Sequence, residues 1–205
     1  MALNYTQELK KIKEEVLNLK ESPLFVYRTE NKYLPVVGEG NHQAGIMLVG
    51  EAPGLNEAKS GRPFCGSAGK LLDELLEGAG LQRSAVYITN ILKDRPPANR
   101  DPLPQEMVIY TPFLDRQIDI IEPKIIVGLG RFSSHYLLKK FGFEAEAQMT
   151  IGNIQGKLFK ISELSKTKVI IPMYHPAAAI YNRKLLTELS QGFKKINKYY
   201  TELIK

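Results

Sequence analysis

Three side chains of the kinds that bind polar ligands or carry charge, Glu57, Asn90 and His175, each follow a short apolar run of the sequence. A carboxylate, an amide and an imidazole all make directional hydrogen bonds, and the first and last can also change charge. Each has an ordinary structural explanation when taken alone, since an Asn at the end of a strand commonly forms a turn and a single His is commonly structural. Their equivalent positions after three different apolar runs favour a common explanation.

A glycine-rich stretch at residues 61–70 resembles a phosphate-binding loop, because it ends in Gly69-Lys70. The motif of such loops requires a glycine where Phe64 stands, and a Ser or Thr where Leu71 stands. Neither requirement is met. The sequence therefore excludes a P-loop at this position.

The elements that must position these side chains are four short apolar runs separated by helical patterns. The runs are typical of strands that are covered on both faces, and they occupy residues 46–50, 86–90, 124–129 and 169–172. Apolar residues three and four positions apart predict amphipathic helices near residues 3–20, 71–79, 107–121, 132–141 and 186–203. A small hairpin is expected at residues 149–161, with two possible turn sites.

The alternation of strands and helices predicts an α/β protein with a parallel sheet flanked by helices. No repeat or linker divides the chain, so residues 1–205 are expected to form a single domain. Sheets of this kind bind ligands at the carboxyl ends of their strands. That rule places Glu57, Asn90 and His175 on one rim of the sheet.

The composition narrows the class of protein. Lys and Arg number 28 against 22 for Asp and Glu, and the net charge of +6 favours a polyanionic partner. Cys65 is the only cysteine, which excludes a disulfide within the chain and a metal site built from cysteines. The sequence begins without the apolar core of a signal peptide and has no apolar run long enough to span a bilayer. We therefore expect a cytoplasmic protein with no membrane partner.

Six short motifs occur in one order along most of the chain. They are Gly-Glu-Ala-Pro-Gly at 50–54, Gly-Arg-Pro-Phe at 61–64, Ala-Gly-Lys-Leu-Leu at 68–72, Tyr-Ile-Thr-Asn at 87–90, Arg-Pro-Pro-Ala-Asn-Arg at 95–100 and His-Pro-Ala at 175–177. Each is weakly specific, but the ordered set is highly specific. From about residue 37 to residue 179 the sequence resembles the uracil-DNA glycosylase superfamily, in particular its family 4 branch.

The resemblance implies a three-layer α/β/α sandwich with a central four-stranded parallel sheet, acting as a monomer on uracil-containing DNA. Such enzymes extrude the target nucleotide and hydrolyse its N-glycosidic bond, which leaves an abasic site in base excision repair. By the family pattern, Phe64 stacks on the extruded uracil and Asn90 pairs with its edge. His175 then donates a hydrogen bond to uracil O2 and stabilises the anion that leaves.

The resemblance also implies a group that acts on the sugar side of the bond. Glu57 is the best candidate to hold water or to balance the sugar cation, with help from Asn99. Glu57 has an alternative role, the exclusion of thymine by crowding its methyl group. Glu51 and Ala52 are expected in the pocket wall, and Ala52 stands where some relatives have Asp.

Residues after His175 are expected to contact DNA. Ala177 allows close approach to a phosphate, Ile180 or Tyr181 is the expected wedge in the minor groove, and Arg183 and Lys184 are expected to contact phosphates. A second phosphate-binding patch is expected from Lys93, Arg95 and Arg100, unless these are solvated surface charges.

The sequence departs from the family at its iron–sulfur site. By local pattern, the four cysteine positions of family 4 are occupied by Leu19, Ser22, Asp94 and Tyr110, none of which is a usual cluster ligand. We therefore expect no cluster and no cofactor. A hydrogen bond between Asp94 and Tyr110 is expected to contribute to the packing that replaces it.

Two other functions remain open from the sequence. One is a related glycosylase that releases hypoxanthine or another deaminated base. The other is a catalytically inactive module that binds DNA or recruits a partner protein.

Overall fold

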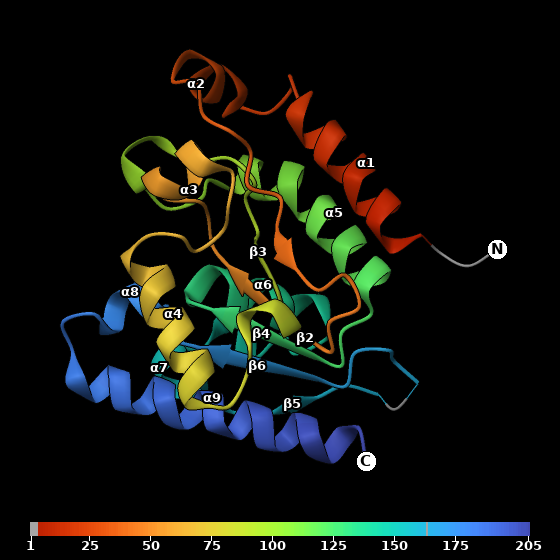
Figure 1. Ribbon diagram of the computed structural model, residues 1–205, viewed down its shortest axis with the longest axis vertical. Helices are drawn as coiled ribbons and strands as arrows, with labels where there is room; N and C mark the ends of the chain where they lie inside the picture. The colour runs from red at the N-terminus through yellow and green to blue at the C-terminus, as the bar shows by residue number, and fades with distance from the viewer. Residues whose placement is uncertain (1–3, 163) are drawn as a thin grey trace.

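A computed structural model describes residues 4–162 and 164–205. Its centre is a six-stranded sheet in the order β1-β3-β2-β4-β6-β5 (Figure 1). The strands are β1 (Glu39–Gly40), β2 (Ile46–Gly50), β3 (Tyr87–Asn90), β4 (Ile125–Leu129), β5 (Phe159–Lys160) and β6 (Val169–Met173). The four inner strands are parallel, and β1 and β5 are short antiparallel additions at the two edges. The expected four-stranded parallel sheet is thus present, extended by one short strand on each side.

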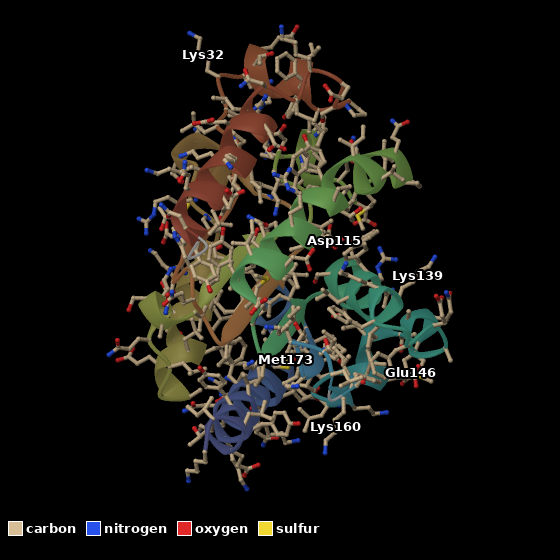
Figure 2. The ribbon with its side chains drawn as sticks, turned by 90° about the vertical axis from the view of Figure 1, so that its right-hand side faces the viewer. Lys32, Asp115, Lys139, Glu146, Lys160 and Met173 are labelled. Atoms are coloured by element: carbon tan, nitrogen blue, oxygen red, sulfur yellow. The ribbon has the colours of Figure 1, made fainter. Side chains whose placement is uncertain are left out.

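Helices cover both faces of the sheet. They are α1 (Tyr5–Leu17), α2 (Phe25–Glu30), α3 (Leu55–Ser60), α4 (Ser67–Gly78), α5 (Pro104–Ile121), α6 (Arg131–Lys140), α7 (Ile151–Ile154), α8 (Pro176–Ala179) and α9 (Arg183–Leu203). The helices α1, α5 and α6 pack on one face of the sheet, and α4 and α9 pack on the other. In Figure 1, α1 and α5 lie at the upper right and α9 lies at the bottom, and Figure 2 shows α5 (green) and α6 (teal) above α9 (blue). The expected three-layer α/β/α arrangement is confirmed.

Alternation of side chains along each strand explains the two core layers. In β2, Met47 and Val49 are buried with α1 and α5, while Ile46 and Leu48 are buried with α4 and α9. A strand sandwiched in this way needs apolar residues at every position, and this is why the runs are continuously apolar rather than alternating.

The parallel register brings the carboxyl ends of the inner strands to one rim. Gly50 at the end of β2 lies opposite Asn90 at the end of β3, and Leu129 at the end of β4 lies opposite Met173 at the end of β6. The loops that follow β2, β3 and β6 therefore start side by side, as the rule for open α/β sheets predicts.

The prediction of a hairpin at residues 149–161 is wrong. Its first half is the single helical turn α7, because Ile151 and Ile154 are three residues apart and Ile154 is fully buried. Its second half, β5, pairs antiparallel with β6, with Phe159 opposite Ile170. The chain gains more burial by joining the edge of the existing sheet than by forming an isolated hairpin.

The helix expected at residues 3–20 spans Tyr5–Leu17, and its expected first residue lies outside the described part of the chain. Asn4 caps its beginning, because the side chain accepts a hydrogen bond from the backbone N–H of Gln7. Among the described residues, no helix is both long and apolar enough to cross a membrane.

Three of the four residues that the resemblance predicts at cluster positions, Ser22, Asp94 and Tyr110, form one buried hydrogen-bonded chain. The Tyr110 hydroxyl lies 2.7 Å from Ser22 Oγ and donates to Asp94 Oδ2 at 2.6 Å. Leu19, at the fourth position, is buried in the same apolar cluster as the Tyr110 ring. The expected hydrogen bond between Asp94 and Tyr110 is present, and Ser22 extends it.

A buried arginine that the sequence did not indicate completes this group. Arg28 is 3% exposed, its Nε lies 3.4 Å from Asp94 Oδ2, and its Nη2 donates to the Leu17 carbonyl at 2.7 Å. The opposite charges thus lie together in the interior, between the N-terminal segment and α5. We call Ser22, Arg28, Asp94 and Tyr110 the polar brace.

Replacing Asp94 with Ala is expected to lower the free energy of unfolding by about 3–5 kcal/mol, because it leaves the Arg28 guanidinium buried without its counter-charge. Glu8→Ala is a suitable control, since Glu8 pairs with Lys11 at the surface and such pairs contribute about 1 kcal/mol or less. Urea unfolding of both variants measures the difference. Equal losses in the two variants would show that the brace does not stabilise the fold.

Candidate active site

A cavity of about 340 Å³ opens at the rim where β2, β3 and β6 end. Most of the residues predicted to act on the base or the sugar line it. They are Glu51, Ala52, Glu57, Phe64, Asn90, Asn99 and His175, and from the predicted DNA contacts Arg100 and Ala177. Pro53, Gly54, Ala68 and Pro96 complete the wall.

Gly50 allows the floor of the cavity to form. A Cβ atom at this position would lie 2.2 Å from Asn90 Oδ1 and 2.8 Å from the Phe64 ring. Such distances are shorter than any real Cβ contact, so no larger residue fits without moving both side chains. The glycine that ends β2 therefore brings the amide of Asn90 and the ring of Phe64 together.

Phe64 has a backbone conformation that is rare for its type. Its φ of 48° lies in the left-handed region, where a residue with a side chain is strained. Two contacts hold it there. The carbonyl of Phe64 packs directly on Gly69, and Arg83 donates to the carbonyl of Pro63 at 2.7 Å. The ring is buried and stacks on His175, with centroids 5.5 Å apart and planes 26° apart.

The imidazole of His175 is held in one tautomer. Its Nδ1 accepts a hydrogen bond from the Ala177 N–H at 3.2 Å, so in the neutral ring the proton is on Nε2. Burial lowers the pKa of His175 to about 4, and the nearby Glu57 carboxylate opposes that shift only in part. At neutral pH the site therefore contains an uncharged imidazole with a free N–H donor.

Glu57 is tied to the start of α4. Its Oε1 accepts hydrogen bonds from the backbone N–H groups of Cys65 and Gly66, each at 3.0 Å. The other oxygen, Oε2, lies close to Gly54 in the cavity wall. One oxygen of the carboxylate thus fixes its orientation, and the second is left for a ligand or a water molecule.

The amide of Asn99 is oriented by Arg95. Arg95 Nε donates to Asn99 Oδ1 at 2.8 Å, and the Arg95 guanidinium also bonds the Tyr27 hydroxyl and lies over the Tyr33 ring. Because an arginine can only donate, the Asn99 oxygen must face it, and the NH₂ group is the end left to act in the cavity. Asn99 also has a left-handed backbone, with a φ of 53°.

Glu51 has an unusual ionisation. Burial raises the pKa of Glu51 to about 7, the neighbouring Asp101 carboxylate adds to the rise, and Arg131 opposes it. The carboxyl group in the cavity wall therefore changes charge near neutral pH. The sequence predicted no role for the side chain of Glu51. Its raised pKa depends on burial and on Asp101 and Arg131, which are distant along the chain, so no local sequence pattern indicates it.

Glu51→Gln is expected to raise the melting temperature at pH 8 and to leave it nearly unchanged at pH 4. The folded pKa of about 7 exceeds the ordinary value of 4.5, so the folded state binds more protons between these values. The contribution of Glu51 to stability is therefore fully present below pH 4.5 and is lost as the pH rises through 7. Thermal melts of Glu51→Gln and of the exposed control Glu74→Gln test this, and a gain independent of pH would contradict it.

The predicted basic patch is wrong at Lys93, which is fully buried and points away from solvent. Arg95 and Arg100 are partly exposed, but both have protein partners, since Arg100 makes two hydrogen bonds to Glu106. Lys93 follows a buried strand by three residues, and its side chain folds back beneath the strand end.

The residues that follow α8 lie outside the cavity, although Ala177 within α8 lines it. Tyr181 is 98% exposed, whereas Ile180 is partly buried. Arg183 and Lys184 are exposed at the start of α9, which Asn182 caps by accepting from backbone N–H groups. An aromatic side chain thus projects into solvent next to two free basic residues.

In the described part of the chain, no group of three or more His, Cys, Asp or Glu residues is arranged to hold a metal ion. The polar and charged side chains that line the cavity are those of Glu51, Glu57, Asn90, Asn99, Arg100 and His175.

Comparison with known proteins identifies the family. Residues 37–203 match the family model of the Uracil DNA glycosylase superfamily. The chain is 50% identical over 189 residues to the type-4 uracil-DNA glycosylase of Sulfurisphaera tokodaii, covering 92% of this chain and 83% of that protein. It is 42% identical over 190 residues to the type-4 uracil-DNA glycosylase of Archaeoglobus fulgidus, covering 93% and 92%. The protein described here belongs to the uracil-DNA glycosylase superfamily and is similar to its type-4 members.

Proposed function

We propose that this protein removes uracil from DNA by hydrolysing the N-glycosidic bond, which leaves an abasic site. The observation that carries the proposal is the joint presence, in one cavity, of the Asn90 amide, the Phe64 ring and a neutral His175 with a free Nε2–H. Similarity to type-4 uracil-DNA glycosylases over nine-tenths of the chain supports the same function.

Recognition of uracil rests on Asn90. An amide can donate to O4 and accept from N3–H, which is the pattern of the uracil edge. Cytosine has an acceptor at N3 and a donor at N4, so it would leave buried polar groups unpaired. Stacking of the base on the Phe64 ring would fix the plane in which the amide reads it.

Cleavage separates charge between base and sugar. The C1′–N1 bond breaks with its electron pair moving to uracil, and the Nε2–H of His175 stabilises the negative charge that develops at O2. The Glu57 carboxylate holds the water that attacks C1′ and accepts its proton. The orientation of Asn99 supports Glu57 as the proton acceptor. The oxygen of Asn99 is bound by Arg95, so only its NH₂ group is free, and this group cannot accept a proton from the water.

Tyr181 is the better candidate for the wedge, because it is almost fully exposed and Ile180 is not. Tyr181→Ala is expected to lower excision from duplex DNA by roughly tenfold, because duplex bases must be unstacked before extrusion. Excision from single-stranded DNA should change much less, since less stacking opposes extrusion there. Single-turnover assays on both substrates test this, with the equally exposed Leu164→Ala as control. Equal losses on both substrates would argue against a wedge.

The substrate is tested with oligonucleotides that carry uracil, hypoxanthine, xanthine, thymine or cytosine at one position. Each is incubated with the purified protein, and abasic sites are cleaved with alkali. Cleavage at uracil alone, or fastest at uracil, supports the proposal. Faster cleavage at hypoxanthine would favour the related glycosylase, and DNA binding with no cleavage at any base would favour an inactive binding module.

A further inference from the structure

Lys93 is a buried lysine next to the proposed uracil reader. Its side chain is fully inaccessible, and its Nζ lies within hydrogen-bonding distance of three acceptors. These are Thr89 Oγ1 at 2.8 Å, the Asn90 carbonyl oxygen at 2.7 Å and Gln117 Oε1 at 2.7 Å. One residue thus links the end of β3 to α5 directly behind the cavity.

The three acceptors are fixed in their roles. The Thr89 hydroxyl donates its proton to the Val37 carbonyl at 2.7 Å, so its oxygen accepts from Lys93. The amide nitrogen of Gln117 donates to the same carbonyl at 2.8 Å, which turns its oxygen toward Nζ. A backbone carbonyl such as that of Asn90 can only accept.

Three fixed acceptors around one nitrogen require three donated protons. An ammonium group has three N–H bonds, whereas a neutral amine has two and a lone pair. Burial acts in the opposite direction and lowers the pKa of Lys93 well below its ordinary value. The three short hydrogen bonds favour the charged form and compensate part of the cost of burying it.

We propose that Lys93 is a positioning residue for base excision, whose ammonium group holds the backbone of Asn90 so that its amide is presented to the base. This inference rests on the proposed function, because it assigns Lys93 an action through Asn90. The side-chain amide of Asn90 occupies the space that Gly50 leaves by having no Cβ, and the backbone carbonyl of Asn90 accepts from Lys93. Asn90 therefore contacts Gly50 through its side chain and Lys93 through its backbone carbonyl.

A double-mutant cycle tests the coupling. Lys93→Met keeps an unbranched apolar side chain but removes all three hydrogen bonds. It is expected to lower the single-turnover rate on uracil by roughly ten- to a hundredfold, and to cause little further loss in an Asn90→Ala background, because coupled residues are not additive. The exposed α1 residue Lys13 supplies the matched control, and Lys13→Met should leave the rate unchanged.

Melting temperature and affinity for abasic DNA are measured on the same preparations. A purely structural role predicts that Lys93→Met lowers both and that its loss of rate adds to that of Asn90→Ala, which would overturn the proposal. If Lys93→Met does not fold, the cycle is repeated with Thr89→Val, which has nearly the same shape and removes one acceptor. Additivity in that cycle would overturn the proposal as well.

The same data separate this inference from the proposed function. If the wild-type protein does not release uracil, or if Asn90→Ala retains the full rate, the proposed function fails. If both behave as proposed and only the coupling is missing, Asn90 reads the base without help from Lys93.

Discussion

Replacing His175 with Ala is expected to lower the single-turnover rate of uracil excision by roughly two to three orders of magnitude, the usual effect of losing one donor that stabilises a developing anion. The Nε2–H is free because Nδ1 accepts from the Ala177 backbone, and the ring is neutral because its pKa is lowered to about 4. Affinity for an abasic product should change much less, since the donor acts on charge that is present mainly in the transition state.

The alternative for His175 is a purely structural role at the start of α8. In that case its loss would lower the melting temperature, the affinity for abasic DNA and the rate together. All three are measured on one preparation, and a fall in rate with the other two preserved supports catalysis. His175 should make no contribution to the pH dependence of the wild-type rate near pH 6.5, where an ordinary histidine titrates, because it is already neutral above about pH 4, so a change of rate near pH 7 should come from Glu51.

Asn90→Asp is expected to have the second large effect. The loss of rate on uracil should correspond to about 3 kcal/mol, because a site built on hydrogen bonds rejects a mismatched partner strongly. A carboxyl group can donate to N3 of cytosine and accept from its N4 amino group, so cytosine should compete better. A carboxylate would also repel the negative charge that develops on the leaving base.

Rates on uracil and cytosine opposite guanine measure this change in selectivity. Asn153→Asp introduces the same chemical change at an exposed position and should leave both rates unaltered. If Asn90→Asp retained the wild-type rate and preference, Asn90 would not read the base.

The sheet and its rim were predictable because each depends on a local pattern. Short continuous apolar runs such as residues 46–50 are typical of strands covered on both faces, and the carboxyl ends of neighbouring parallel strands meet at one edge of the sheet. The segment at 149–161 was not predictable, since a single helical turn and a strand of two residues are too short for either periodicity to appear.

The sequence predicted which residues line the candidate site, but not how their side chains are oriented. The motifs brought Glu57, Asn90 and His175 together, yet which oxygen of Glu57 is free depends on backbone groups at Cys65 and Gly66. Lys93 was misplaced for a similar reason. A lysine among polar residues is ordinarily exposed, and the burial of Lys93 depends in part on an acceptor from Gln117, 24 positions away along the chain.

The polar brace shows the same limit. A hydrogen bond between Asp94 and Tyr110 was predictable because both residues stand where the family pattern has cluster cysteines, and the structure contains it. The burial of Arg28 was not predictable, because Arg28 lies on a short helix whose sequence has no apolar periodicity to indicate burial.

The left-handed backbone at Phe64 is a local strain that the burial of its ring outweighs. A glycine there would release the strain that a side chain imposes at a φ of 48°, but it would also remove the ring that closes the floor of the cavity. The ring is also buried in the core, and losing a buried phenylalanine side chain costs about 3–5 kcal/mol. This is more than the roughly 1–3 kcal/mol of backbone strain that glycine would release, so a laboratory selection for heat resistance alone would still retain the ring. Engineering of this protein for hot conditions must keep Phe64 constant and seek its gains elsewhere.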